Sequence, residues 1–342
     1  MKKKIVASHA KRTPRIFLAK KTPLISGLLV AGVAVAMSAF YLSPHADTTT
    51  TASFETESGT RTGVTALTDA TASGGSAIRF GVAAPTPPSG EAMPVGDLAG
   101  WKQVFTEDFT SGNHAVGTFP GNGSFPGNYA TKWHVGYGDN VPDTAGKNNG
   151  NRSVYYPSKV LSIQNGVMNM FLHSQNGQSL GAAPMPKVNK QTWPYNGQLY
   201  GKWTVRFKSE PIHGFKTAWL LWPDSGLWDD GEIDFPEGDL DGTISAFSHC
   251  ANIGNPSRNC IYGSTSARYT SWHTASIEWT PGRVTFILDG QTIATGTASV
   301  PTKSMHYVMQ TESCFGGASD CPAANATANL QVDWISIYTY NP

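Results

Sequence analysis

The chain has 342 residues, of which only 14% are charged, and its formal net charge is +1. An average soluble protein carries about 25% charged residues. A nucleic-acid partner requires a basic surface that neutralises phosphates, so this charge balance argues against one. The 36 glycines, 22 prolines, 10 tryptophans and 12 tyrosines are instead typical of a turn-rich β-protein that handles sugars.

The N-terminus joins a basic segment, up to Lys21, to an apolar run at residues 23–42. This order is typical of an export signal, which we expect within residues 1–46. The run also reaches the length of a membrane span, about 20 residues. Two alternatives therefore remain: a signal peptide cleaved near Ala34-Val35-Ala36, or a retained anchor that contacts the membrane through residues 23–42. Both place the rest of the chain outside the cytoplasm.

Residues 47–98 are dominated by Thr, Ser, Ala, Gly and Pro, and they end near the proline-rich segment Ala84–Gly90. Large apolar side chains are too sparse here to offset the entropy lost on ordering. We therefore expect a disordered linker.

Residues 99–342 show the period of two that is typical of half-buried antiparallel strands. Lys202–Lys208 and Thr274–Trp279 alternate between apolar and polar residues, and Met168, Met170 and Leu172 share one face. Asp289-Gly290 between apolar runs indicates a tight hairpin. No segment has a sustained helical period, so the sequence predicts one all-β sandwich domain.

The four cysteines, Cys250, Cys260, Cys314 and Cys321, all lie in the part expected to be exported. An even number in an oxidising compartment favours two disulfides. The short spacings favour Cys250–Cys260 and Cys314–Cys321, each closing one loop. Zinc ligation is the alternative, although no Cys-x-x-Cys occurs.

The segment Gly231–Gly238 concentrates three carboxylates, Glu232, Asp234 and Glu237. Alternation along a strand places Glu232 and Asp234 on one face. Glu237 joins them only if a β-bulge inserts one residue, and proline in strands is largely confined to edges and bulges, so we expect the bulge at Phe235-Pro236. Two carboxyl groups across a scissile bond are the usual apparatus of glycoside hydrolysis.

The competing interpretation of these carboxylates is a solvated acidic strand face. Three tryptophans just upstream, Trp219, Trp222 and Trp228, and the flanking glycines argue against it. Like charges this close are unfavourable unless one is protonated, which is how a catalytic acid arises.

Glu232–Glu237 resembles the E-x-D-x-x-E signature of the family 16 glycoside hydrolases, in the laminarinase-like branch with the β-bulge. Further segments resemble that family in order and spacing: Val104–Phe109, Tyr200–Trp203, Trp272–Pro281, Asp289-Gly290 and Val332–Ile335. Together they extend from Trp101 to Tyr340.

The resemblance implies a concanavalin A-like jelly roll of two curved antiparallel sheets with a glycan cleft. It implies that Glu232 is the nucleophile, that Glu237 is the general acid/base, and that Asp234 positions the nucleophile. The implied activity is that of an exported, retaining, endo-acting β-glycan hydrolase, with β-1,3- or mixed β-glucan as the leading substrate. We expect a monomer that needs no cofactor for its chemistry.

Several further residues are expected to bind the substrate. Trp228 lies where the family often has a tryptophan that packs on a sugar ring. Trp219 and Trp222 have opposite parity in one strand, so at most one of them faces the cleft. His249 should return near the nucleophile strand, and Gln310 stands where relatives usually have a substrate-binding asparagine.

The resemblance also implies a structural calcium ion, for which Asp108 and Asp333 are the candidate ligands. Two functions stay open beside hydrolysis. One is transglycosylation, in which a sugar instead of water intercepts the covalent intermediate. The other is a non-catalytic glycan-binding module on the same fold.

Overall fold

The computed structural model describes residues 64–68, 76–80, 87–188 and 197–342. The segment 1–46, for which an export signal or anchor is expected, lies outside them. Within these described ranges, no helix has the length and apolar character needed to cross a membrane.

The chain divides into two compact units, Met1–Val82 and Ala83–Pro342. In the first unit, β1 (Val64–Thr68) pairs antiparallel with β2 (Ser76–Phe80). Both strands fall within residues 47–98, where the composition predicts a disordered linker. These two short runs form strands because they carry much of the segment's β-branched and apolar content, which favours β-structure.

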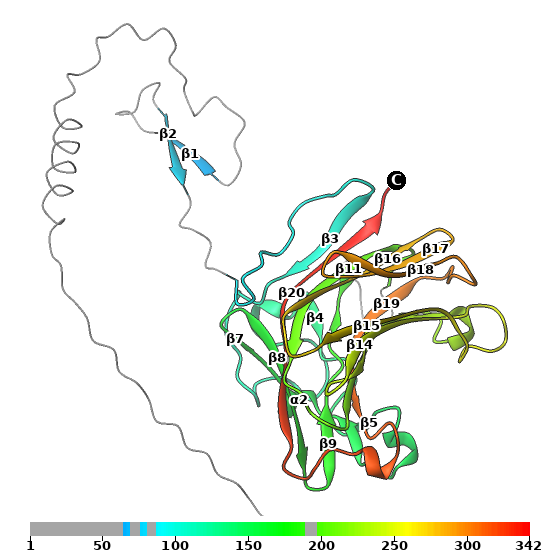
Figure 1. The fold of residues 1–342 in the computed structure, drawn as a ribbon. Helices are drawn as coiled ribbons and strands as arrows, with labels where there is room; N and C mark the ends of the chain where they lie inside the picture. Colours follow the sequence, from blue (N-terminus) through cyan, green and yellow to red (C-terminus); the bar gives the residue numbers. More distant parts are fainter. Residues whose placement is uncertain (1–63, 69–75, 81–86, 189–196) are drawn as a thin grey trace, which may run out of the picture. The chain divides into compact units, whose positions relative to one another are not determined.

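The second unit is a sandwich of two sheets (Figure 1). The path of the larger, eleven-stranded sheet is β18 (Gln291–Gly296), β17 (Arg283–Leu288), β16 (His273–Thr280), β11 (Gly201–Ser209), β20 (Thr327–Tyr340), β8 (Val167–Gln175), β9 (Gln178–Gly181), β6 (Ser153–Tyr155) and β5 (Val141–Pro142), with β3 (Trp101–Glu107) beside β20 and β7 (Leu161–Gln164) beside β8. The smaller sheet has the order β15 (Asn259–Arg268), β14 (Thr243–His249), β13 (Glu232–Asp239), β12 (Phe215–Pro223) and β19 (Met305–Ser313).

Short elements complete the domain: β4 (Trp133–His134) paired with β10 (Met185–Pro186), the four-residue helix α2 (Pro157–Val160), and the 3-10 turns η3 (Gly127–Tyr129), η4 (Gly146–Asn148), η6 (Trp228–Asp230) and η7 (Ala318–Asp320). The pairings are antiparallel except that of β6 with β9. This architecture confirms the predicted all-β jelly roll.

The predicted alternation places the core between the sheets. Trp203, Val205 and Phe207 of β11 are buried. Phe207 contacts Trp219 of the smaller sheet, with ring centroids 5.3 Å apart. The hairpin at Asp289-Gly290 also forms as predicted, because both residues take positive φ, 49° and 76°.

The ordered domain begins earlier than the predicted boundary at residue 99. Residues 87–98 lie against the larger sheet: the Ser89 N–H donates to Asp333 at 3.1 Å, and Trp334 Nε1 donates to the Glu91 carbonyl at 2.9 Å. Glu91 also pairs with Arg206 at 2.9 Å. Hydrogen bonds and charge, not burial of large apolar side chains, therefore order this segment, and composition alone does not reveal it.

Both predicted disulfides are present, Cys250–Cys260 and Cys314–Cys321. The first closes the loop between β14 and β15, and the second closes the turn that follows β19. No cysteine of the described residues is free.

We expect the double variant Cys250→Ser/Cys260→Ser to lose about 2 to 3 kcal/mol of unfolding free energy, because a bridge over a loop of this length removes that much entropy from the unfolded chain. Urea unfolding of the oxidised wild type and the variant would measure the loss. Adding a reductant to the variant should then remove only the contribution of Cys314–Cys321. An unchanged unfolding midpoint in the double variant would contradict the prediction.

Candidate active site

Strand β13 presents its carboxylates on the face turned away from the core. Ile233 and Phe235 are buried in the core between the sheets, and Phe235 contacts Phe286 of the larger sheet at 5.5 Å. Glu232 and Asp234 alternate with these two residues and therefore point to the opposite face. That face of the smaller sheet is called the cleft face below.

A one-residue bulge brings Glu237 onto the same face. On one side of β13, Asp234 pairs with Phe247 and Glu237 with Ser245, so three steps on β13 oppose two on β14. The same mismatch occurs against β12, where Ala218 opposes Glu237 and Leu220 opposes Asp234. The extra residue lies at Phe235-Pro236, which confirms the predicted bulge.

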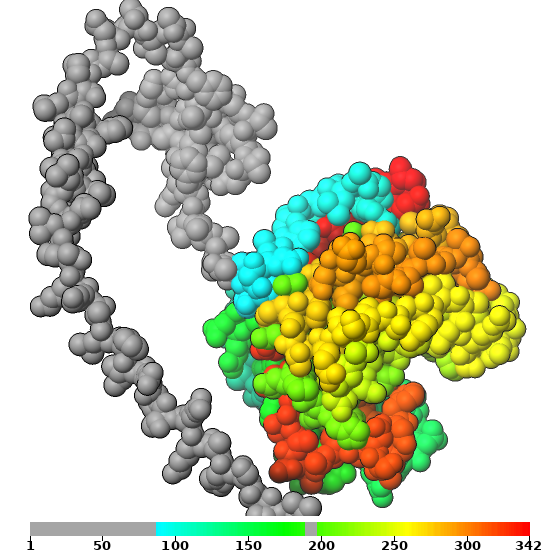
Figure 2. Space-filling view, in the orientation of Figure 1, coloured from blue at the N-terminus to red at the C-terminus, as the bar shows by residue number. Residues whose placement is uncertain are grey.

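The cleft face is bordered on one side by residues 143–155. The Thr144 N–H donates to Glu312 of β19 at 3.3 Å, and Tyr155 Oη donates to Gln310 Oε1 at 3.1 Å. Figure 2 shows a hollow between the lower lobe, coloured green and red, and the yellow lobe that contains residues 250–260. Through β12, Gln310 of β19 lies in register with Glu237, so this border lies beside the carboxylates of β13.

Burial dominates the electrostatics of the first two carboxylates. It raises the pKa of Glu232 to about 7, and the charge of Glu237 adds to the rise, while hydrogen bonds from Asp234 and Trp228 oppose it. Burial and the charge of Glu232 raise the pKa of Asp234 further, well above its ordinary value. Glu232 and Asp234 therefore titrate as a pair. Asp234 is the protonated member, and it donates a hydrogen bond to the Glu232 carboxylate.

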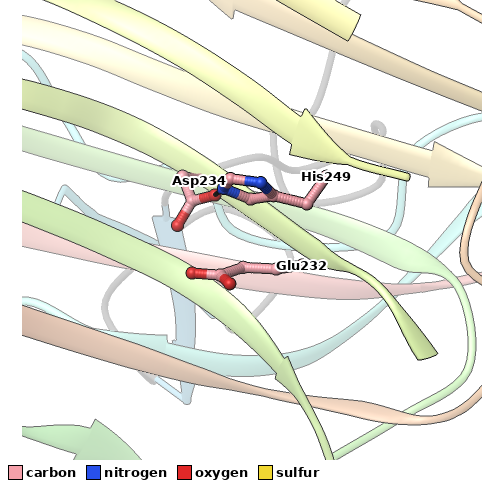
Figure 3. A group of neighbouring side chains, drawn as sticks. All are labelled: Glu232, Asp234 and His249. Carbon is pink, nitrogen blue, oxygen red and sulfur yellow. Dashed lines mark ion pairs between the residues drawn. The ribbon is translucent and has the colours of Figure 1, made fainter. Parts of the chain in front are cut away.

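His249 closes this group from β14, as Figure 3 shows. It lies directly opposite Glu232 in the register, and its Nε2 lies 3.4 Å from Asp234 Oδ2. Burial lowers the pKa of His249, which favours the neutral imidazole. The predicted return of His249 to the nucleophile strand is thus confirmed, whereas its role stays a prediction.

Lys216 of β12 is a further residue of this face. Its Nζ donates to Glu237 Oε1 at 2.7 Å, and the side chains of both residues are largely buried. Burial alone would lower the pKa of Lys216, but the charge and hydrogen bond of Glu237 outweigh this and raise it. The sequence contains an indication of this ion pair: Lys216 is the single charge in the apolar run 215–223, and a buried charge requires a partner.

The tryptophans divide between the two faces of the smaller sheet. Trp219 is fully buried in the core, so its expected role in substrate binding is wrong: its parity places it with Leu221, behind the cleft face. Trp222 has the opposite parity and packs with the cleft-side cluster that includes Leu220. Trp228 lies on η6 and remains 39% exposed. Its ring centroid is 5.6 Å from that of His249.

Gln310 and Tyr155 form one wall of the site through the hydrogen bond described above. Tyr137 stacks on Tyr155 with centroids 4.9 Å apart and is 40% exposed, which makes it a further aromatic surface for a sugar ring. Tyr156, the neighbour of Tyr155, and His273 do not belong to this wall. Tyr156 packs against the main core, and His273 pairs with Asp289 at 2.6 Å.

Asp108 and Asp333 lie close enough for the charge of Asp108 to raise the pKa of Asp333, although burial is the larger cause. Asp333 also accepts the hydrogen bond from the Ser89 N–H. Asp333 belongs to β20, and Asp108 directly follows β3. In the described part of the chain no third acidic or histidine side chain joins them, so the calcium site stays a prediction.

Comparison with known proteins agrees with this geometry. The model of glycosyl hydrolases family 16 matches residues 187–336. No curated protein matches the sequence. Among solved structures, the endo-β-1,3(4)-glucanase SCLam is 18% identical with a TM-score of 0.53, and the match covers 75% of this chain and 97% of that one.

Two laminarinases show the same likeness, those of Rhodothermus marinus and Flavobacterium sp. UMI-01. Each is 19% identical to this chain with a TM-score of 0.52. The match to the Rhodothermus marinus enzyme covers 71% of this chain and 98% of that one, and the match to the Flavobacterium enzyme covers 70% and 100%. At these identities the likeness shows the fold.

The matched family model and the carboxylates of β13 agree on the class of protein. Residues 187–336, which include all three carboxylates, match glycosyl hydrolases family 16. The protein is a glycoside hydrolase that acts on O-glycosyl bonds.

Proposed function

We propose that the protein is an exported, retaining, endo-acting hydrolase of β-glycans, with β-1,3- or mixed β-1,3/1,4-glucan as its substrate. The observation that carries the proposal is the set of three carboxylates, Glu232, Asp234 and Glu237, which a one-residue bulge places on one face of the smaller sheet. A solvated strand face needs neither the bulge nor the burial of Asp234.

In the proposed mechanism Glu237 takes up a proton from solvent before the reaction. Glu232 then attacks the anomeric carbon while Glu237 donates that proton to the departing sugar oxygen. The glycosyl–enzyme ester is then hydrolysed by a water molecule that Glu237, now a base, deprotonates. Asp234 donates its proton in a hydrogen bond to Glu232 and fixes the orientation of that carboxylate.

The substrate class rests on the likeness to glucanases and on the aromatic surfaces of the site. A variant of SCLam presents 1,3-β-D-cellobiosyl-glucose at its active site. In this chain Trp228 and Tyr137 offer exposed rings of the kind that pack on pyranoses. The N-terminal basic and apolar segments and the two disulfides support export.

The test is reducing-sugar release from a panel of purified polysaccharides: laminarin, mixed-linkage β-glucan, cellulose, xylan and galactans. We expect release from the β-1,3-containing glucans, with an early fall in viscosity because an endo enzyme cuts within chains. Chromatography of the products distinguishes hydrolysis from transglycosylation, which would give oligosaccharides longer than the substrate. Binding without cleavage of any member would support the glycan-binding alternative instead.

We expect kcat/KM for an activated aryl β-glycoside to fall as the pH drops below about 7. Glu232 must be ionised to attack, and burial raises its pKa from 4.5 to about 7. Each further unit below that value should reduce the rate about tenfold, since the ionised fraction falls in that proportion. An aryl leaving group departs without a proton, so the profile isolates the nucleophile. An acid limb near pH 4.5, typical of a solvated glutamate, would contradict the burial argument.

A further inference from the structure

The group formed by Glu232, Asp234 and His249 has an unused acceptor at its centre. Asp234 is 1% exposed, and its Oδ2 has no hydrogen-bond partner. This atom faces His249 Nε2 across 3.4 Å. The three residues each present a potential metal ligand, and these ligand atoms all lie within 4.8 Å of one another (Figure 3).

The spacing suits a tetrahedral ion. Carboxylate oxygen and imidazole nitrogen bind Zn²⁺ at about 2.0 to 2.2 Å, which separates two tetrahedral ligands by about 3.4 Å. Asp234 and His249 already have this separation. The Glu232 ligand atom lies within 4.8 Å of the other two, and side-chain rotation can bring it closer. Two carboxylates and a neutral imidazole form the mixed N/O ligand set of many zinc sites.

We propose that Glu232, Asp234 and His249 form an inhibitory site for a divalent transition-metal ion such as Zn²⁺, with water in the fourth position. The ion would take the lone pairs of Glu232 that attack the sugar, and it would therefore compete with the glycan. Metal binding depends only on the three side chains, whereas inhibition rests on the proposed catalytic role of Glu232.

A histidine on the same sheet provides a matched control. His306 of β19 also pairs with an aspartate, Asp224, at 2.8 Å. Among the residues that the structure describes, however, no group of three potential ligands includes it. Replacing His306 removes a histidine of similar surroundings without touching the proposed site.

Isothermal titration of the full-length, metal-free protein with ZnCl₂ tests the proposal. Histidines elsewhere in the chain are common to all variants, so the comparison isolates this site. We expect one site that weakens at least tenfold in each of Glu232→Gln, Asp234→Asn and His249→Gln, and that is unchanged in His306→Gln. Thermal unfolding in EDTA verifies that each variant is folded.

A second measurement separates the two parts of the proposal. On any glycan that the wild type cleaves, Zn²⁺ should raise KM without lowering kcat, and EDTA should restore the initial rate. Loss of zinc binding in the three variants, even if no glycan is cleaved, supports the metal site and leaves the proposed function to its own test. Equal zinc affinity in wild type and His249→Gln, or equal loss in His306→Gln, would overturn the metal site.

Discussion

Replacing Glu232 by alanine should abolish turnover of every glycan, because no covalent intermediate can form without the nucleophile. The loss should be as complete for an activated aryl β-glycoside as for a polysaccharide. Added azide should then give a product of inverted configuration, the α-glycosyl azide, since azide enters the space that the carboxylate leaves and attacks directly. Nuclear magnetic resonance of the product establishes the anomer.

Replacing Glu237 should impair catalysis in a different way. A polysaccharide needs a proton on its leaving oxygen, so Glu237→Ala should lose most of its activity on it, a factor of about 10² to 10⁴. An aryl glycoside should still form the intermediate, which then accumulates because no base activates water. Azide needs no base and should restore turnover with retained configuration.

Asp234→Asn provides the comparison within the same face. Its role is to orient Glu232, so the variant should be impaired on all substrates, and azide should not rescue it. If both alanine variants keep near-wild-type rates on a glycan that the wild type cleaves, these carboxylates are not the catalytic pair. The glycan-binding interpretation would then stand.

The parts of this site that follow from local rules could be predicted from the sequence. The alternation in β13 and the proline at the bulge are sufficient to place Glu232, Asp234 and Glu237 on one face, and the strand register confirms this placement. The hairpin at Asp289-Gly290 and the disulfides close over short sequence distances. Each of these features depends on few residues that are near one another in the chain.

What could not be predicted depends on the pairing of distant segments. Alternation along the strand shows that Trp219 and Trp222 point to opposite faces. Because β12 has apolar residues on both faces, the sequence does not indicate which face packs in the core. The order of residues 87–98 comes from partners such as Asp333 and Arg206, which lie more than a hundred positions away.

The ion pair of Lys216 with Glu237 is the clearest example of such a long-range feature, and it carries the second large effect that we expect. Lys216 holds the acid/base through a 2.7 Å hydrogen bond. Its Nζ also lies 4.4 Å from the ring centroid of Phe315, in the loop that Cys314–Cys321 closes. In this scheme Lys216 contacts Glu237 and not the sugar, and its role is to position Glu237.

Lys216→Met should lower kcat on a polysaccharide by about 10- to 100-fold, a part of what general acid–base catalysis contributes. Glycosylation by an activated aryl glycoside needs no acid, so its rate, measured as the release of the first equivalent of phenol, should change less than threefold. A residue that only stabilises the fold would affect both substrates alike. Lys216→Arg keeps the charge and should recover part of the loss.

Lys202→Met is the matched control for this prediction. Lys202 pairs with Glu278 at 2.9 Å between β11 and β16, so its loss removes an ion pair of the same kind from the other sheet. Its kinetics should equal those of the wild type, because this pair lies on the other sheet and does not contact the carboxylates. Equal loss on both substrates in Lys216→Met, or a wild-type rate on the polysaccharide, would show that Glu237 does not depend on Lys216 for its position.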